Sequence, residues 1–215
     1  MNTKQDRPSR SGPPSLTERR KAATQLDIAR AAAELFADKG PDGTTAEEIA
    51  SRAGVALRTF YRYFRNKQDA VGPLLSSGGD RWRALLAETG PDVGLARALE
   101  SAAVTSLSPE DDVAEEALRW TRGLLRAART DPALRAVWSQ VNSDSEERLL
   151  PVLARLAGPD ADPLEIRLVA AAATSAIRVS LEAWAAADAG SAESPADLVV
   201  RCLRELTAGL RLMAR

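Results

Sequence analysis

Apolar residues recur along this chain at helical spacing, and glycine, proline and capping residues divide the pattern into segments. The first apolar stripe, at positions i, i+4, i+7 and i+8, consists of Ile28, Ala32, Leu35 and Phe36. Ser15 and Glu18 have the spacing of a capping box, and Gly40 and Pro41 interrupt the pattern. We therefore expect the first helix to begin near Ser15 and to end at Gly40.

Two short helices are predicted next, with a sharp turn between them. Thr44 and Glu47 repeat the capping-box spacing, which indicates a helix over about 45–53. Gly54 supplies the turn, and a third helix follows over about 56–63. Ala56 precedes that helix and cannot accept a capping hydrogen bond, which costs about 1 kcal/mol.

A fourth helix is expected to open at Asn66 or Lys67 and to be interrupted soon afterwards. Gly72–Pro73 and the run Ser76–Gly79 follow closely. Proline inside a helix costs about 3 kcal/mol, and each glycine costs about 1 kcal/mol relative to alanine. The pattern therefore predicts a kinked or broken segment over 72–80, followed by a helical stretch at about 80–88.

The rest of the chain is predicted to form five further helices, over about 93–106, 109–129, 132–157, 163–189 and 195–213. Four of them have a capping residue followed by proline, namely Ser108–Pro109, Asp131–Pro132, Asp162–Pro163 and Ser194–Pro195. Strand-like alternation of useful length does not occur. The predicted fold class is therefore all-α.

Composition narrows the class of protein. The chain has 215 residues, enough for one large domain or two small ones, and 45% of them are hydrophobic. It has no histidine and one cysteine, so it lacks the commonest general base, the commonest metal ligand and any internal disulfide. No apolar run is long enough to span a membrane, and the N-terminus has no secretory signal. We expect a cytoplasmic protein that is not an enzyme, binds no cofactor or metal and does not enter a membrane.

Charge is distributed unevenly along the chain. Residues 1–67 contain 13 Lys/Arg and 8 Asp/Glu, a net charge of +5, whereas residues 68–215 contain 16 and 22, a net charge of −6. A basic N-terminal part indicates a polyanionic partner for that part alone, with chance clustering as the alternative. Residues 1–14 are rich in proline, show no periodicity and are expected to form a disordered arm.

The third predicted helix has two chemically different faces. At about 100° per residue, the apolar face consists of Leu57, Phe60, Tyr61 and Phe64, and the opposite face consists of Arg58, Thr59, Arg62 and Tyr63. Arginine pairs with the O6 and N7 of guanine, hydroxyls bond phosphates, and such a helix fits a major groove. A solvated amphipathic helix is the alternative interpretation of the same pattern.

These segments together resemble a known family. The matching positions are Ile28–Ala32, Leu35–Phe36, Gly40, Thr44–Thr45, Ile49–Ala50, Ala53–Val55, Thr59–Phe64 and Lys67. Residues 19–71 are similar in type and spacing to the DNA-binding domain of the TetR family of repressors, and the run Arg58–Phe64 is most similar to the mycofactocin-system regulator-like branch. The resemblance implies a homodimer that binds palindromic double-stranded operator DNA and is released by a small-molecule effector.

The resemblance also implies DNA contacts at the matching positions Thr45, Thr59, Tyr61, Tyr63 and Lys67. Thr45 would cap the second helix and touch a phosphate, and Lys67 would hold a phosphate at the head of the fourth helix. The helical wheel places the ring of Tyr61 on the core side, so only its hydroxyl is expected to reach DNA. We expect Arg58 and Arg62 to read bases.

Apolar stripes on the last two predicted helices suit a pairing of subunits. They consist of Leu164, Leu168, Ala171, Ala172, Ser175, Val179 and Ala183 on one helix and of Val199, Cys202, Leu203, Leu206, Leu210 and Met213 on the other. Burial within one subunit explains the pattern as well, and the resemblance favours a four-helix dimer interface. The expected organisation is an arm at 1–14, a helix-turn-helix domain at 15–71 and a ligand-binding and dimerisation domain at 72–215.

Residue type alone suggests ligand contacts in this second domain. Four tryptophans stand out, namely Trp82, Trp120, Trp138 and Trp184, and such residues belong more often to the core than to a pocket. Trp120, Trp138 and Trp184 are the candidates. Arg178 lies in an apolar helix and would either meet an acidic ligand or extend to solvent. We expect an apolar or acyl-type effector, and the narrower resemblance implies an acyl thioester or a similar lipid-like molecule.

Two functions of other classes fit the same sequence. An α-helical enzyme could use a carboxylate site at Asp111, Asp112, Glu115 and Glu116, although these acids also suit the N-terminus of a helix. A helix-turn-helix adaptor could bind another protein instead of DNA.

Overall fold

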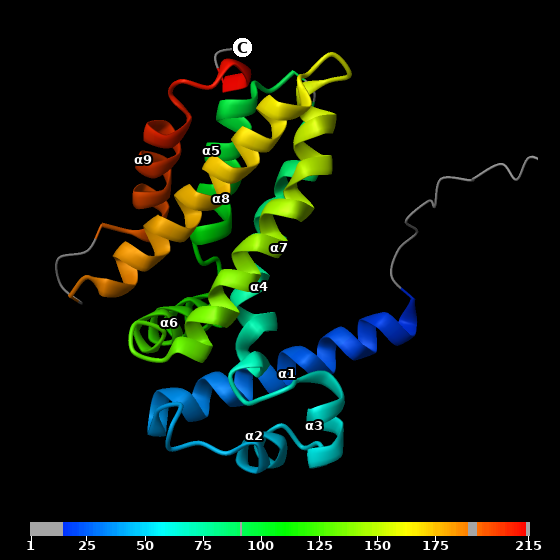
Figure 1. Cartoon of the computed structure of the whole chain (residues 1–215), viewed down its shortest axis with the longest axis vertical. Helices are drawn as coiled ribbons and strands as arrows, with labels where there is room; N and C mark the ends of the chain where they lie inside the picture. The colour runs from blue at the N-terminus through cyan, green and yellow to red at the C-terminus, as the bar shows by residue number, and fades with distance from the viewer. Residues whose placement is uncertain (1–14, 91, 189–192, 214–215) are drawn as a thin grey trace, which may run out of the picture.

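The computed structural model describes residues 15–90, 92–188 and 193–213. These residues form nine α-helices and two short 3-10 turns without a strand, which confirms the all-α prediction. The first three helices form a head at one end of the molecule (Figure 1): α1 (Leu16–Lys39), α2 (Ala46–Arg52) and α3 (Leu57–Tyr63). The arm predicted over residues 1–14 lies outside the described residues.

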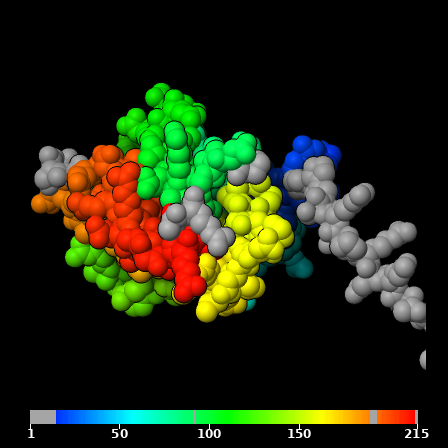
Figure 2. Space-filling model, turned by 90° about the horizontal axis from the view of Figure 1, so that it is seen from above, coloured from blue at the N-terminus to red at the C-terminus, as the bar shows by residue number. Residues whose placement is uncertain are grey.

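Six helices form the body above the head (Figure 1). They are α4 (Gly72–Glu88), α5 (Leu95–Leu107), α6 (Asp112–Ala127), α7 (Pro132–Ala157), α8 (Pro163–Ala186) and α9 (Pro195–Thr207). Helix α8 packs against α6, α7 and α9, and α4 packs against α5 and α7. At the end far from the head, α9 and the final 3-10 turn (Arg211–Met213) lie beside α5 (Figure 2).

Four of the helix starts follow the predicted capping residues. Ser15 caps α1, because its hydroxyl accepts from the Glu18 N–H at 3.2 Å and Glu18 bonds back to the Ser15 N–H at 2.7 Å. Asp131, Asp162 and Ser194 cap α7, α8 and α9, each with proline at the start of the helix. These starts are local, so the sequence alone locates them.

Other boundaries differ from the prediction. Helix α6 does not begin at Pro109, because Asp111 caps it by accepting from the Ala114 N–H at 2.8 Å. Helix α5 begins at Leu95, after Gly94, instead of at about residue 93. Helix α9 ends at Thr207, and the expected continuation to 213 is a separate 3-10 turn.

Helix α4 is continuous, so the predicted break over 72–80 is wrong. Pro73 lies in the first turn, where its missing N–H needs no partner. A side chain at Gly79 would place its Cβ 3.2 Å from the Ser145 hydroxyl, so glycine allows α4 to approach α7 closely. Packing of α4 against its neighbours outweighs its weak helix propensity. The helix also starts later than predicted, because Asn66 accepts from the Asp69 N–H at 2.8 Å and opens a 3-10 turn (Asp69–Val71) first.

The head and the body share one continuous core. Ile28, Ile49 and Phe60 are fully buried in the head, and α1 packs against α4 and α6 of the body. Gln68, at the start of the 3-10 turn, donates to Asp131 at 3.3 Å, the residue that caps α7. The head is therefore attached to the body through both apolar packing and a polar contact.

Candidate functional site

Two adjacent threonines hold the loop before α2. Thr45 caps α2, because its hydroxyl accepts from the Glu48 N–H at 3.2 Å and Glu48 accepts from the Thr45 N–H at 2.9 Å. Thr44 is buried and donates to two carbonyls at the end of α1, at 3.2 and 2.9 Å. The capping box predicted for Thr44 and Glu47 is therefore wrong by one residue, and the cap is Thr45.

An ion pair also holds the loop before α2. The Lys39 ammonium lies 2.6 Å from Glu48, and this hydrogen bond, together with the bond from the Thr45 N–H, lowers the pKa of Glu48 below its usual range. The carboxylate therefore stays ionised at the N-terminus of α2, where the helix dipole favours negative charge. Arg52 at the other end of α2 pairs with Glu34 of α1 at 2.7 Å. Both ends of α2 are thus tied to α1.

A glycine turn sets the angle between α2 and α3. Gly54 has φ of +67°, the left-handed region that side chains with a Cβ rarely adopt. The chain closes the turn through the Val55 N–H, which donates to the Ala50 carbonyl at 2.9 Å. Helix α3 then starts at Leu57 without a side-chain cap at Ala56, as the sequence predicts.

Helix α3 is anchored by two aromatic residues rather than three. Phe60 is fully buried and Phe64 is 6% exposed, with their ring centroids 5.6 Å apart. The side chain of Tyr61, however, is 53% exposed, so the prediction that its ring packs in the core is wrong. Helix α3 packs on α2, and the face that it buries includes Phe60 but not Tyr61.

The outward side of α3 carries cations and hydroxyls. Arg58, Tyr61 and Arg62 are exposed, and Thr59 and Tyr63 are half-buried. The Arg62 guanidinium lies 4.9 Å from the centre of the Tyr63 ring and donates to the Tyr63 hydroxyl at 3.1 Å. This contact restricts the position of the guanidinium before any partner binds.

Lys67 lies in the loop after α3, close to the start of α2. Its ammonium donates to the Thr44 carbonyl at 2.9 Å and joins two segments that are 23 residues apart in the sequence. An ammonium has three donors, so this bond leaves two of them available to a further acceptor. The predicted position at the head of a helix is not found, because α4 begins only at Gly72.

Among the described residues, the cations of this surface lack carboxylate partners. Lys39 and Arg52 are paired with carboxylates, whereas Arg58, Arg62, Arg65 and Lys67 have no carboxylate oxygen within 4.0 Å. Unpaired cations beside exposed hydroxyls match the chemistry of a phosphate backbone. We call this surface, Arg58 to Lys67 with Thr45, the α3 surface.

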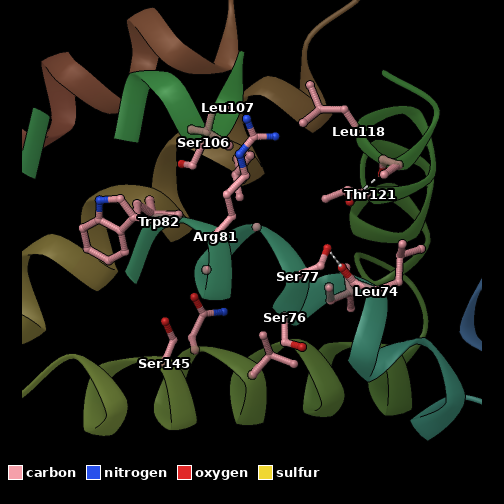
Figure 3. Close-up of a pocket in the computed structure, with 18 of the residues that line it drawn as sticks. Leu74, Ser76, Ser77, Arg81, Trp82, Ser106, Leu107, Leu118, Thr121 and Ser145 are labelled. Carbon is pink, nitrogen blue, oxygen red and sulfur yellow. Dashed lines mark hydrogen bonds between the residues drawn. The ribbon is translucent and has the colours of Figure 1, made fainter. Parts of the chain in front are cut away.

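A cavity of about 230 Å³ lies in the body between α4, α5, α6, α7 and α8 (Figure 3). Four consecutive residues of α4, Ser76–Gly79, line it together with Trp82, and Trp138 of α7 and Thr174 of α8 contribute other walls. The run that suggested a broken helix is therefore a cavity wall, where small side chains leave space. Helix α4 connects this cavity with α1 of the head.

The predicted ligand residues are not brought together. Trp138 lines the cavity, and its indole N–H donates to Glu182 at 2.8 Å. Trp184 is buried with the Arg122 guanidinium 5.0 Å from its ring, and Trp120 lies in a crevice between α1 and α6. Arg178 pairs with Glu182 on the surface of α8 at 3.0 Å. Of the four, only Trp138 has a wall position in the cavity.

Two lining residues, Trp82 and Thr174, were not among the predicted ligand contacts. Trp82 is 1% exposed and its indole N–H donates to the Leu99 carbonyl at 3.4 Å. Thr174 stands in the middle of an apolar helix next to Ser175, and this pair of hydroxyls was the available signal.

The acidic residues at 111–116 belong to the start of α6 and do not form the carboxylate site of the alternative enzyme function. Asp111 caps α6, and Asp112 and Glu115 lie in its first turn, where negative charge is favourable. The described part of the chain brings together no group of three acidic, cysteine or histidine side chains suited to a metal ion. In the same residues, no helix combines the length and apolar character that a membrane span requires.

Comparison with known sequences gives two family matches. Residues 28–71 match the model described as "Bacterial regulatory proteins, tetR family", and residues 94–211 match the "MftR C-terminal domain". The HTH-type transcriptional regulator TcmR of Streptomyces glaucescens is 29% identical over 164 residues, 73% of this chain and 72% of TcmR. The HTH-type transcriptional repressor Rv3405c of Mycobacterium tuberculosis is 35% identical over 89 residues, 39% of this chain and 47% of that protein.

Solved structures share the fold. The TetR family repressor AlkX of a Dietzia species aligns with a TM-score of 0.57 at 19% identity, covering 86% of this chain and 97% of AlkX. The fatty acid degradation regulator FadR of Bacillus halodurans aligns with a TM-score of 0.51 at 19% identity, covering 87% of this chain and 96% of FadR. The matched families and relatives are DNA-binding transcriptional regulators and not enzymes. The N-terminal match is to the TetR family itself, and the C-terminal match covers more than half of the chain. The chain therefore belongs to the TetR family of transcriptional regulators.

Proposed function

We propose that this regulator binds a palindromic operator as a homodimer through the α3 surface and is released when a small, largely apolar molecule occupies the body cavity. The observation that carries the proposal is the α3 surface itself: exposed cations without carboxylate partners stand on a helix anchored by a fully buried Phe60. A rigid helix with outward arginines suits the major groove. Two such helices would need a spacing of about 34–36 Å to meet successive half-sites.

Within this proposal, Arg58 and Arg62 read bases, while Thr45, Thr59, Tyr61, Tyr63 and Lys67 position the protein on the backbone. The exposure of Tyr61 gives its whole ring access to DNA, and not only its hydroxyl. Arg62 arrives already stacked on Tyr63, which lowers the entropy lost when its guanidinium pairs with a base.

The proposal predicts different losses for two variants. Arg58→Ala should cost about 1–3 kcal/mol on the operator and relax the preference at one base pair. Lys67→Ala should weaken binding to all sequences alike, because it removes a phosphate contact. Fluorescence anisotropy with a palindrome from the promoter of its own gene, its single-base variants and a scrambled duplex measures both.

Arg52→Ala is the matched control, because Arg52 is paired with Glu34 and lies outside the α3 surface. Equal losses on every sequence for Arg58→Ala would remove Arg58 as a base reader. Equal affinity of the unaltered protein for palindromic and scrambled DNA, at the weak level of the scrambled duplex, would instead favour the protein-binding adaptor.

We assign the dimer interface to α8 and α9. Helix α8 is covered by α6, α7 and α9 but keeps an open apolar side, where Leu164, Leu168 and Val179 are 62%, 46% and 40% exposed. Leu206 of α9 is 47% exposed. Part of the predicted stripe belongs to the subunit's own core, because Val199 and Leu203 are buried. The remaining open strip fits a second copy related by a two-fold axis.

Leu168→Glu should convert the dimer to a monomer. The two-fold axis would bury two unpaired carboxylates, each at a cost of about 1–3 kcal/mol or more, so the dimer Kd should rise about 100-fold or more. Light scattering at micromolar concentration measures the state. Val113→Glu, at a residue of α6 that is 61% exposed, is the control and should remain dimeric. An unaltered protein that is monomeric at this concentration would contradict the paired-helix model.

Helix α4 connects the proposed ligand-binding cavity with the proposed DNA-binding head. It lines the cavity over Ser76–Gly79 and contacts α1, which in turn holds both ends of α2. A ligand that fits the cavity better when α4 is displaced would therefore move the head. A coupling of about 1–3 kcal/mol suffices to change operator affinity about 5- to 150-fold.

A further inference from the structure

The aromatic walls of the cavity offer carbon rather than hydrogen-bonding atoms. Trp82 and Trp138 are both nearly fully buried. Each indole N–H is already used, by the Leu99 carbonyl at 3.4 Å and by Glu182 at 2.8 Å. The rings are thus held by partners outside the cavity and present apolar surface to an occupant.

One buried hydroxyl in the wall lacks a partner. Thr174 is 5% exposed, and among the described residues its hydroxyl oxygen makes no hydrogen bond. Threonine in a helix ordinarily bonds the carbonyl four residues earlier, as four others in this protein do: Thr24, Thr105, Thr121 and Thr207. Leaving such a group buried and unsatisfied costs free energy, so the exception requires an explanation. A ligand in the cavity that Thr174 lines supplies one.

The cavity wall contains one cation, which is already paired with a carboxylate. Arg81 is the only charged residue among those that line it in the described chain. Its guanidinium lies 2.8 Å from the Glu110 carboxylate, with which an anionic ligand would have to compete. Moving an uncompensated carboxylate, phosphate or ammonium from water into such a site would be strongly unfavourable.

The size of the cavity limits the occupant. Its volume of about 230 Å³ exceeds the roughly 150 Å³ that accommodates benzene but falls below the roughly 300–1,000 Å³ of sites for drug-sized ligands. One ring with a short substituent, or a chain of similar volume, fits. An acyl thioester with its charged carrier group does not fit inside it.

We propose that the cavity binds an uncharged molecule about the size of one substituted ring, whose hydroxyl or carbonyl group bonds the Thr174 hydroxyl while its apolar part lies against Trp82 and Trp138. This deepens the proposed function, because it names the chemical class of the effector, and it departs from the acyl thioester that the family resemblance implied. A threonine hydroxyl both donates and accepts, so either ligand group satisfies it.

The test uses four probes on the full chain: 4-ethylphenol, ethylbenzene, 4-ethylbenzoate and lauroyl-CoA. Calorimetry gives Kd, and tryptophan fluorescence reports occupancy beside Trp82 and Trp138. We expect 4-ethylphenol to bind more tightly than the two anions. Thr174→Val, which keeps the shape but removes the hydroxyl, should raise the Kd of 4-ethylphenol about 3- to 10-fold and leave that of ethylbenzene within about twofold.

Thr121→Val is the matched control, because Thr121 lines the same cavity but its hydroxyl already donates to the Ala117 carbonyl at 2.9 Å. It should change the Kd of 4-ethylphenol less than about twofold. Unchanged binding of ethylbenzene to Thr174→Val shows at the same time that the variant is folded.

Three results would overturn the inference: no probe binding up to millimolar concentration, tighter binding of either anion than of 4-ethylphenol, or equal effects of the two valine substitutions. Operator binding is measured on the same samples to separate this inference from the proposed function. Release of the operator by lauroyl-CoA alone would reject the chemical class and retain the ligand-responsive regulator. A failure to bind any operator would reject the regulator model whatever the probes do.

Discussion

Replacing Phe60 by alanine is expected to unfold the DNA-binding head, at a cost of about 3–5 kcal/mol. Phe60 is completely buried, and its ring lies 5.6 Å from that of Phe64 and 5.3 Å from that of Tyr61. Helix α3 has seven residues and no side-chain cap, so it is too short to persist without this anchor. Urea denaturation followed by circular dichroism measures the loss in the free energy of unfolding.

The neighbouring aromatic residue provides the control for this variant. Tyr61→Ala removes a side chain that is 53% exposed and should cost less than about 1 kcal/mol of stability. Operator binding should vanish in Phe60→Ala while most of the helical signal, which comes from the body, remains. A Phe60→Ala protein that kept the stability of Tyr61→Ala would show that α3 is held by other contacts.

Operator affinity is expected to fall about 10³- to 10⁵-fold between 50 and 200 mM salt, the range for a protein that contacts 6–10 phosphates. The α3 surface has four cations without carboxylate partners among the described residues, Arg58, Arg62, Arg65 and Lys67, and a dimer presents them twice. Each neutralised phosphate releases counterions and contributes about −0.9 to the slope of log K against log salt. Anisotropy titrations at several KCl concentrations give this slope.

Lys67→Ala tests the origin of the slope, because it should reduce the slope by about 1 per subunit. The unaltered chain and the Arg52→Ala variant are the two references. The variant should keep the full slope, since Arg52 is already paired with Glu34. A nearly flat salt dependence on a true operator would contradict a binding mode built on phosphate contacts.

The local features of this fold were predictable from the sequence. Capping residues such as Ser15 and Asp131 and the turn at Gly54 each act within a few residues, so their patterns specify the structure directly. Most of the α3 surface was predictable for the same reason, apart from the exposure of Tyr61, the loop position of Lys67 and the contribution of Arg65. Whether Tyr61 is buried depends on how wide a face of α3 is covered by α2, which is a tertiary property.

The cavity could not be predicted, because its walls come from five helices that are distant in the sequence. The run Ser76–Gly79 gave a strong local signal for a broken helix, and packing against α5 and α7 reversed it. Trp120, Trp138 and Trp184 are the same residue type, yet only Trp138 lines the cavity. Residue type does not distinguish a tryptophan in the cavity wall from one in the core, because the rotation of the helix decides where the side chain lies.

The composition of α4 bears on how strongly a ligand must bind to act. Relative to alanine, two serines and two glycines at 76–79 reduce helix stability by roughly 2–3 kcal/mol. That figure matches the roughly 1–3 kcal/mol of coupling that an allosteric regulator needs. Packing against α5 and α7 holds this stretch in a helix. In a regulator of the proposed kind, the four small residues would lower the cost of displacing α4, so a smaller difference in ligand affinity between the two states would suffice to release the operator.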